Sequence, residues 1–298
     1  MKKSFEFKKY LSKRIEYVNL VLEKILPKDN STISKGMRYS VLAGGKRLRP
    51  ILVILAAEFF GAKARDVIYA ACAVEYMHTY SLVHDDLPAM DNDDLRRGVL
   101  TNHKKFGEAS AILCGDALLT ESFNLITKSK CSEKNINEAI KVLANYAGYK
   151  GMIAGQVEDT IQTGVWNSEN KVLLKEKLKF IHIQKTAALM IASLKIGAIL
   201  IGADKGSLKV FENYGKNMGI AFQITDDILD VYADKKLLGK KGSDIKNNKL
   251  TTLSLYTKQE AEKKIEEYMK KAKKTIAVFG DKSEIFVKLA DYITSRTY

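Results

Sequence analysis

Residues 66–91 read DVIYAACAVEYMHTYSLVHDDLPAMD, and this stretch decides the fold. Up to His84, apolar residues occupy nearly every side of a helix, which is typical of a helix buried in a protein core. Pro88 ends the helix, because a proline ring clashes with the preceding turn and supplies no N–H donor. We therefore predict a helix that runs through the centre of the protein and is packed on all sides.

An acidic cluster stands at the end of this helix. It consists of Asp85, Asp86 and Asp91. Ionised carboxylates are rarely buried without a partner, so they must face a cavity, a metal ion or water. Magnesium suits such ligands, since it takes one or two carboxylates together with substrate phosphates and water. Zinc is not indicated, because no set of His and Cys has a suitable spacing.

A second acidic cluster lies far along the chain. Gln223, Asp226, Asp227 and Asp230 follow one another at i, i+3, i+4 and i+7, which places them in one stripe on an otherwise apolar helix. A polar stripe is often an ordinary solvated face. Here three carboxylates repel one another within two turns and no Lys or Arg shares the stripe, which favours a bound cation.

Two groups of basic residues accompany the acidic clusters. Residues 44–50 read GGKRLRP, where Lys46 and Arg49 stand beside a flexible Gly-Gly and next to a helix start. Backbone N–H groups at a helix start, with cationic side chains alongside, can bind an anion, although such a turn by itself is more often solvated. Arg96 and Arg97 form a second cationic pair close to the first acidic cluster. Groups for anions and for metal ions therefore occur together.

The rest of the chain is also helical in pattern. Apolar residues recur at helical spacing over most of the 298 residues, only three prolines are present, and no stretch shows strand alternation over a useful length. No Pro/Gly/Ser-rich linker divides the chain, so we expect one all-α domain spanning residues 1–298. The expected helices cover about 5–26, 34–42, 50–60, 66–84, 108–127, 135–152, 171–201, 207–232, 258–278 and 282–294.

Composition limits the partners and the compartment. Lys and Arg outnumber Asp and Glu by 49 to 35, which raises the case for a polyanionic partner, but the lysines are spread along helices without a nucleic-acid motif, so we expect no nucleic acid. Three cysteines without metal spacing and an N-terminus without a secretory apolar core indicate a cytoplasmic protein. Glu58 and Lys195 interrupt the longest apolar runs, so no membrane span is expected.

Taken together, these motifs resemble the short-chain trans-polyprenyl diphosphate synthases, and among them the bacterial farnesyl diphosphate synthases. The likeness runs from about Tyr39 to the C-terminus, and the motifs that carry it are Gly44–Pro50, Glu75–Gly98, Gly115-Asp116, Gly155-Gln156, Lys185-Thr186, Gln223–Asp230 and Gly239-Lys240. The resemblance implies the isoprenoid synthase fold, with antiparallel helices around a deep central cavity. It also implies a homodimer, and two aspartate motifs that face each other across the mouth of the cavity.

The resemblance further implies a condensation of isopentenyl diphosphate with an allylic diphosphate, dimethylallyl or geranyl. Mg²⁺ ions that bridge to the allylic diphosphate would be held by Asp85, Asp86, Asp91, Asp226, Asp227 and Asp230. The same diphosphate would contact Arg96, Lys185 and Lys240. The isopentenyl diphosphate would be bound by Gly45, Lys46, Arg49, His78 and Arg97. Thr186 and Gln223 would stabilise the carbocation, and the released diphosphate would accept the proton.

Tyr80 bears on the length of the product. It lies five residues before Asp85, roughly 7 to 8 Å further along the helix. On a buried helix it could simply be a core tyrosine with a satisfied hydroxyl. In the resembled family, a bulky side chain at this position forms the pocket floor and stops elongation, so Tyr80 favours the C15 product, farnesyl diphosphate, over the C20 product, geranylgeranyl diphosphate.

Three other interpretations compete with this one. A non-catalytic prenyltransferase-like subunit is disfavoured because both aspartate motifs and the basic groups are intact. A terpene cyclase would share the helical fold but would not need Lys46, Arg49 and Arg97 for a second diphosphate. A nucleic-acid-binding protein would show salt-sensitive affinity for DNA or RNA instead of Mg²⁺-dependent diphosphate binding.

Overall fold

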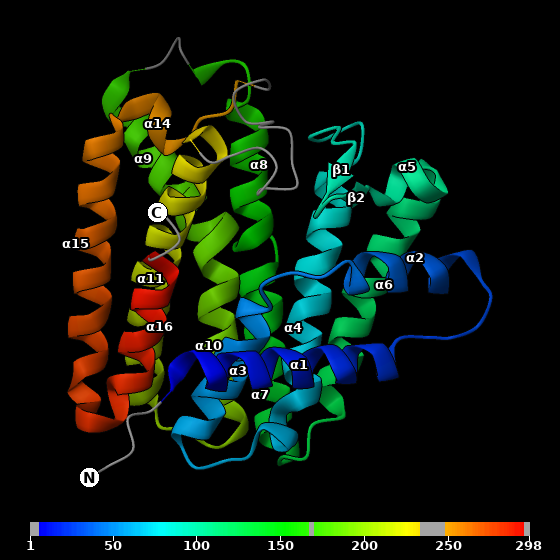
Figure 1. Cartoon of the computed structure of the whole chain (residues 1–298), viewed down its shortest axis with the longest axis vertical. Helices are drawn as coiled ribbons and strands as arrows, with labels where there is room; N and C mark the ends of the chain where they lie inside the picture. Colours follow the sequence, from blue (N-terminus) through cyan, green and yellow to red (C-terminus); the bar gives the residue numbers. More distant parts are fainter. Residues whose placement is uncertain (1–5, 167–169, 233–247, 295–298) are drawn as a thin grey trace.

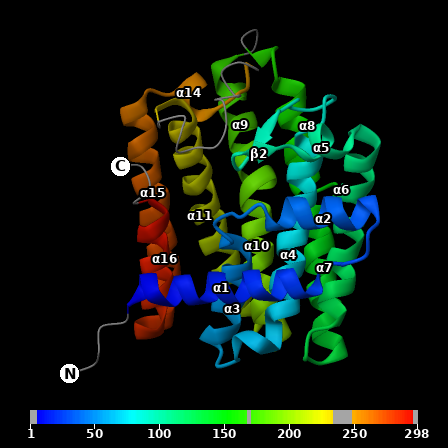
Figure 2. The same cartoon turned by 45° about the vertical axis from the view of Figure 1, so that its right-hand side comes forward.

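The computed structural model describes residues 6–166, 170–232 and 248–294, and within them it confirms the all-α prediction (Figure 1). Long helices run side by side in a bundle, while α1 crosses them at a steep angle in both views (Figures 1 and 2). The α-helices are α1 (Phe7–Ile25), α2 (Thr32–Leu42), α3 (Leu48–Phe59), α4 (Ala64–Asp85), α5 (Asn102–Phe106), α6 (Glu108–Thr127), α7 (Glu133–Ala147), α8 (Met152–Gln162), α9 (Lys171–Ile181), α10 (Ala188–Leu200), α11 (Lys205–Tyr232), α14 (Thr252–Leu255), α15 (Lys258–Ile276) and α16 (Glu284–Thr294).

The centre of the bundle is formed by α4 and α10. Helix α4 packs against α3, α6 and α10, and its residues Cys72 and Met77 are fully buried. Helix α10 belongs to two apolar clusters at once, since Leu189 packs toward α4 and α7 while Met190 packs toward α3 and α11. The apolar pattern of residues 66–84 therefore reflects burial in the core, and these residues do not offer a surface for a second subunit.

Two expected helices are interrupted in the structure. The stretch 171–201 contains a π-helical segment, His182–Ala187, between α9 and α10. The stretch 135–152 ends at Ala147, and α8 begins afresh at Met152. Gly148 and Gly151 occupy the break, and glycine is a poor helix former because it loses the most backbone entropy. Both interruptions matter for the site, because the π-helical segment and α8 carry residues that line it.

A short hairpin was not anticipated. Strand β1 (Leu95–Arg96) pairs antiparallel with β2 (Val99–Leu100), and two residues per strand are too few to show an alternating pattern. Arg97 and Gly98 form the turn with φ values of 55° and 80°, as two-residue hairpin turns require. The hairpin stands beyond the end of α4 (Figure 1). Its residues Arg96 and Arg97 both line the cavity described below.

Two helical stretches reach the length and mean hydropathy of a membrane span, which differs from the expectation based on uninterrupted apolar runs. They are Glu108–Thr127 and Lys171–Leu200, of which the most apolar windows are 39% and 78% buried. The second stretch forms the core through α10, and the first packs one face on α4. Core helices of globular proteins have the same length and composition, so these stretches are weak evidence for a membrane.

Candidate active site

A deep cavity of about 1060 Å³ opens between α4, α6, α8, α11 and the π-helical segment. Its lining combines apolar side chains, among them Leu119 and Met152, with the charged side chains of both acidic clusters and both basic groups. Thirteen of the site residues predicted from the sequence line this cavity together. They are Lys46, Arg49, His78, Tyr80, Asp85, Asp91, Arg96, Arg97, Lys185, Thr186, Gln223, Asp226 and Asp230. Lys240 lies outside the described residues.

The first acidic wall is built by the end of α4 and the turn that follows. The backbone N–H of Asp91 donates to the carbonyl oxygen of Asp85 at 2.8 Å, so the chain returns on itself and both side chains face the cavity. Burial raises the pKa of Asp85, against the attraction of Lys185, and the nearby Asp91 raises it further. The two carboxylates are thus an unfavourable pair that a divalent cation would stabilise.

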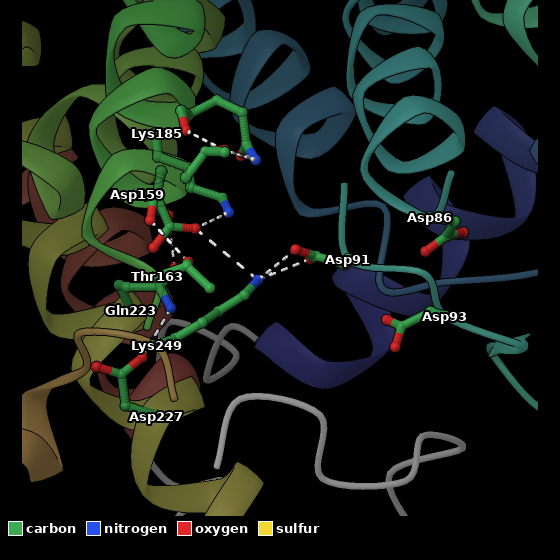
Figure 3. A network of polar contacts seen from close by, with 12 residues as sticks. Asp86, Asp91, Asp93, Asp159, Thr163, Lys185, Gln223, Asp227 and Lys249 are labelled. Carbon is green, nitrogen blue, oxygen red and sulfur yellow. Dashed lines mark hydrogen bonds and ion pairs between the residues drawn. The ribbon is translucent and has the colours of Figure 1, made fainter. Parts of the chain in front are cut away.

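Asp86 does not join this pair. This residue is only 2% exposed, and its carboxylate accepts hydrogen bonds from both Nε and Nη2 of Arg96. Asp93 also contacts Arg96, at 3.4 Å, and Figure 3 shows Asp86 and Asp93 well apart from Asp91. The predicted motif therefore divides into two carboxylates that line the cavity and one that orients a cavity arginine.

The opposite wall, on α11, divides in the same way. Asp226 and Asp230 line the cavity, whereas Asp227 is 5% exposed and accepts hydrogen bonds from the backbone and hydroxyl of Thr252, at 2.8 and 2.6 Å. Burial alone would raise the pKa of Asp227, but hydrogen bonds from His182, Thr252 and Gln223 lower it. Asp227 therefore anchors α14 to α11. Neither Asp86 nor Asp227 belongs to the described residues that line the cavity.

Gln223 and Thr186 are held in a defined orientation. The Gln223 amide nitrogen donates to Asp227 at 2.9 Å, so the amide oxygen is turned toward Thr186, whose hydroxyl donates to it at 2.5 Å. This chain fixes which end of the Gln223 amide faces the cavity. A carbonyl dipole with a set direction can face a developing positive charge without reorganising.

Two lysines and a buried aspartate, Asp159 of α8, lie beside the first acidic wall. Lys185 donates to Asp159 at 2.6 Å, while Lys249 donates to Asp91 at 2.7 Å and lies 3.9 Å from Asp159 (Figure 3). Burial disfavours a charged lysine, but Asp159, Asp85 and Asp91 outweigh it and raise the pKa of Lys185. The ammonium group of Lys185 is therefore charged, and both lysines lie close to the carboxylates of the first wall.

Sequence reasoning missed Lys249 and Asp159. Lys249 follows the second acidic cluster by many residues and shares no helical spacing with it, so no local signal identifies it. A signal did exist for Asp159, four residues after Gly155 on the same face of α8. A Cβ on Gly155 would lie 2.1 Å from the backbone nitrogen of Lys185, so this glycine lets α8 approach the π-helical segment and places Asp159 beside Lys185.

A basic group occupies the other side of the cavity. Arg49 donates to Nε2 of His78 at 3.2 Å. Burial and the surrounding arginines hold the pKa of His78 well below its usual value, so the ring is neutral and Nε2 accepts. Gly45 does not line the cavity, but it makes room for Arg97. Its φ of 129° suits glycine, and a Cβ at this position would lie 2.7 Å from the guanidinium carbon of Arg97.

The donor set fits magnesium. Within the described residues, no three carboxylate, His or Cys groups lie close enough to enclose a metal ion by themselves. Paired carboxylates on two walls of an open, basic cavity instead match an ion that takes one or two carboxylates and completes its shell with substrate phosphates and water. Asp85 and Asp91 could hold such ions from one side, and Asp226 and Asp230 from the other.

Such a fold and site define a class of protein, the helical enzymes that bind a diphosphate at the mouth of a deep apolar cavity. The family described as polyprenyl synthetase matches residues 30–285, and the chain belongs to this family of trans-prenyltransferases. The chain is 42% identical over 271 residues to farnesyl diphosphate synthase of Bacillus subtilis, and the match covers 90% of each protein. It is 41% identical over 298 residues to geranylgeranyl pyrophosphate synthase 4 of Arabidopsis thaliana, and that match covers 99% of this chain and 79% of the relative.

Solved structures agree with this membership and confirm the isoprenoid synthase fold. A geranyltransferase from Helicobacter pylori, complexed with magnesium and isoprenyl diphosphate, superposes with a TM-score of 0.85 at 29% identity over 99% of both chains. A geranyltransferase from Legionella pneumophila gives a TM-score of 0.84 at 31% identity over 98% of this chain and 97% of that one. Farnesyl and geranylgeranyl synthases match at nearly equal identity, so the likeness leaves the product length open.

Proposed function

We propose that this protein is a farnesyl diphosphate synthase, which condenses isopentenyl diphosphate with dimethylallyl and then geranyl diphosphate. The observation that carries the proposal is the cavity itself, which has a carboxylate pair on each side of its mouth, two separate basic groups and a deep apolar wall. A single diphosphate would need one basic group. Two such groups around one apolar cavity suit two diphosphate substrates whose hydrocarbon parts must meet.

The allylic diphosphate binds between the acidic walls. Asp85 and Asp91 on one wall and Asp226 and Asp230 on the other would hold Mg²⁺, which when bound would supply positive charge to neutralise the departing diphosphate. Arg96, Lys185 and Lys249 line the same region and contact that diphosphate as it acquires charge. Their fixed positions lower the barrier to cleavage of the C–O bond, because the charges need not reorganise during the reaction.

Isopentenyl diphosphate binds at the basic side, to Lys46, Arg49, Arg97 and the neutral ring of His78. Its double bond attacks the allylic carbocation, which the oriented oxygens of Thr186 and Gln223 stabilise. The proton lost from the new chain passes to the released diphosphate, so no side-chain base is required. The apolar wall keeps water from quenching the cation to an alcohol.

Tyr80 limits the product to fifteen carbons. Its side chain lines the cavity, is 6% exposed and packs edge-on against His84 with ring centroids 5.7 Å apart. Burial and Asp85 raise the pKa of Tyr80 to about 12, so its hydroxyl stays neutral. A rigid ring held in this way can block a growing chain below the catalytic carboxylates.

The proposal is tested by incubating the purified protein with Mg²⁺, isopentenyl diphosphate and either dimethylallyl or geranyl diphosphate. Chromatography of the dephosphorylated alcohols identifies the product, and farnesol is expected from both starters. Geranylgeraniol as the main product would keep the chemistry and reject the assigned length. Absence of any Mg²⁺-dependent product would instead favour a non-catalytic subunit.

Replacing Tyr80 with alanine is expected to shift the main product from farnesol to geranylgeraniol or longer alcohols, because the shortened side chain deepens the cavity. Tyr80→Phe is the matched control and should still give farnesol, since it retains the ring. The product distributions of the two variants, measured at equal turnover, show whether the ring of Tyr80 limits the length of the product. An unchanged chain length in Tyr80→Ala would mean that another residue forms the floor.

We also propose that the chain forms a homodimer, as the family resemblance implies. Its support is a set of exposed apolar side chains on α6 and α8. Leu113 lies outside the cavity lining, and Ile112, Ile153, Val157 and Ile161 also border the cavity. Burying such side chains against a second copy would remove apolar surface from water. Analytical ultracentrifugation tests this, and a monomer at micromolar concentration would reject it.

A further inference from the structure

Glu75 is a buried carboxylate beside the basic side of the cavity. It lies on α4 and is 1% exposed. Its Oε1 accepts a hydrogen bond from Arg47 at 2.6 Å and lies 4.0 Å from Nη2 of Arg97. Glu75 also interacts electrostatically with a third arginine, Arg49. Burial lowers the pKa of Arg49, and the negative charge of Glu75 opposes this fall. One carboxylate therefore serves a cluster of three guanidinium groups.

Arg47 differs from its basic neighbours in the loop of residues 44–49. It is 3% exposed and packed away from the cavity, and each of its side-chain nitrogens has a protein acceptor. Nε donates to Asn19 at 2.8 Å, Nη1 to Glu75 at 2.6 Å and Nη2 to the carbonyl oxygen of Val41 at 2.7 Å. Arg47 is thus committed to the protein, while Lys46 and Arg49 on either side face the cavity.

The backbone of Arg47 needs such an anchor. Its φ of 47° lies in the left-handed region, which is unfavourable for a residue with a side chain and persists only where the surroundings enforce it. This turn directly precedes α3 and sets the directions in which Lys46 and Arg49 leave the chain. The ion pair with Glu75 therefore fixes a loop whose shape aims two cavity cations.

Glu75 also connects two further parts of the site. Arg97 donates to the carbonyl oxygen of Gly44 while its other nitrogen faces Glu75, so the hairpin is tied to the same loop. His78, which accepts from Arg49, lies one turn after Glu75 on the same face of α4. The loop, the hairpin and α4 therefore meet at this carboxylate.

We propose that Glu75, through its pair with Arg47, is a positioning residue for the diphosphate of the second substrate. It holds Lys46, Arg49 and Arg97 in one converging set and offsets the repulsion among the guanidinium groups. It touches no substrate itself. The inference rests on the proposed function, because it concerns the subsite assigned there to isopentenyl diphosphate.

The test measures KM for isopentenyl diphosphate and KM for geranyl diphosphate in the Glu75→Gln variant and in the wild-type protein. The KM for isopentenyl diphosphate is expected to rise about tenfold, since Arg97 and the loop lose their common ionic partner. The KM for geranyl diphosphate should stay within about twofold of the wild-type value, because the allylic groups Arg96 and Lys185 are held by other carboxylates, Asp86 and Asp159. Glu75→Asp should recover part of the loss. Glu58→Gln is the matched control, since Glu58 pairs with Arg14 away from the cavity and should leave both constants unchanged.

Glu75→Gln leaves Arg47 as a buried charge and can impair folding. The double variant Arg47→Met/Glu75→Met removes both charges and retains every cation that lines the cavity, so a folded double variant should show the same selective rise in KM. An unchanged or lowered KM for isopentenyl diphosphate, or equal rises in both KM values, would overturn the proposal. Loss of folding in both variants would also overturn it, because the Arg47–Glu75 pair would then serve stability alone. Failure of the wild-type protein to consume isopentenyl diphosphate would instead reject the proposed function.

Discussion

Replacing Asp85 with asparagine is expected to lower kcat on the order of 10²–10³-fold, with the fold intact. Asp85 lies at the mouth of the cavity beside Asp91, and its carboxylate is strained by burial and by that neighbour, as its raised pKa indicates. Asparagine has nearly the same shape but no charge with which to hold Mg²⁺. The departing diphosphate would then lose part of its neutralising charge in the transition state.

Steady-state kinetics with geranyl and isopentenyl diphosphates measure this loss, and circular dichroism reports on the fold. Asp94→Asn is the matched control, because Asp94 is exposed and pairs with Lys104 at 2.9 Å outside the cavity lining. Wild-type kinetics in a folded Asp85→Asn protein would remove the residue from the mechanism. A comparable loss in Asp94→Asn would point to a general effect of charge near the hairpin.

Lys249→Met is expected to reduce kcat/KM for the allylic substrate about 10²-fold. Lys249 donates to Asp91 and lies near Asp159, so it bridges the first acidic wall and the group that holds Lys185. Methionine fills a similar volume without the charge. The variant therefore loses a contact to the allylic diphosphate as well as a cation that steadies two carboxylates.

Initial rates at varied geranyl diphosphate and saturating isopentenyl diphosphate measure the effect of Lys249→Met. Lys258→Met serves as the control, since Lys258 pairs with Glu262 on the surface of α15 and should keep wild-type rates. A loss below about threefold would show that Lys249 only ties Asp91 to Asp159 in the absence of substrate. An equal loss in the control would indicate a response to net charge.

Local sequence determined the helical framework. The extent of α6 follows from its apolar periodicity, and the burial of α4 follows from a pattern that leaves no polar face. Asp226 and Asp230 were placed on one face of a helix by spacing alone, because side chains at i and i+4 leave a helix in similar directions. These features depend on residues within a few turns of one another, and sequence reasoning can therefore reach them.

Tertiary contacts decided the division of labour within each acidic motif. Asp86 and Asp227 have the same side chain as their neighbours, yet Arg96, 10 residues further on, and Thr252, 25 residues further on, hold their carboxylates outside the cavity lining. Lys249 reaches Asp91 from 158 positions away. No local pattern encodes which carboxylate meets which cation, because a buried charge is stabilised by whatever partner the packing of distant elements brings within a few ångströms.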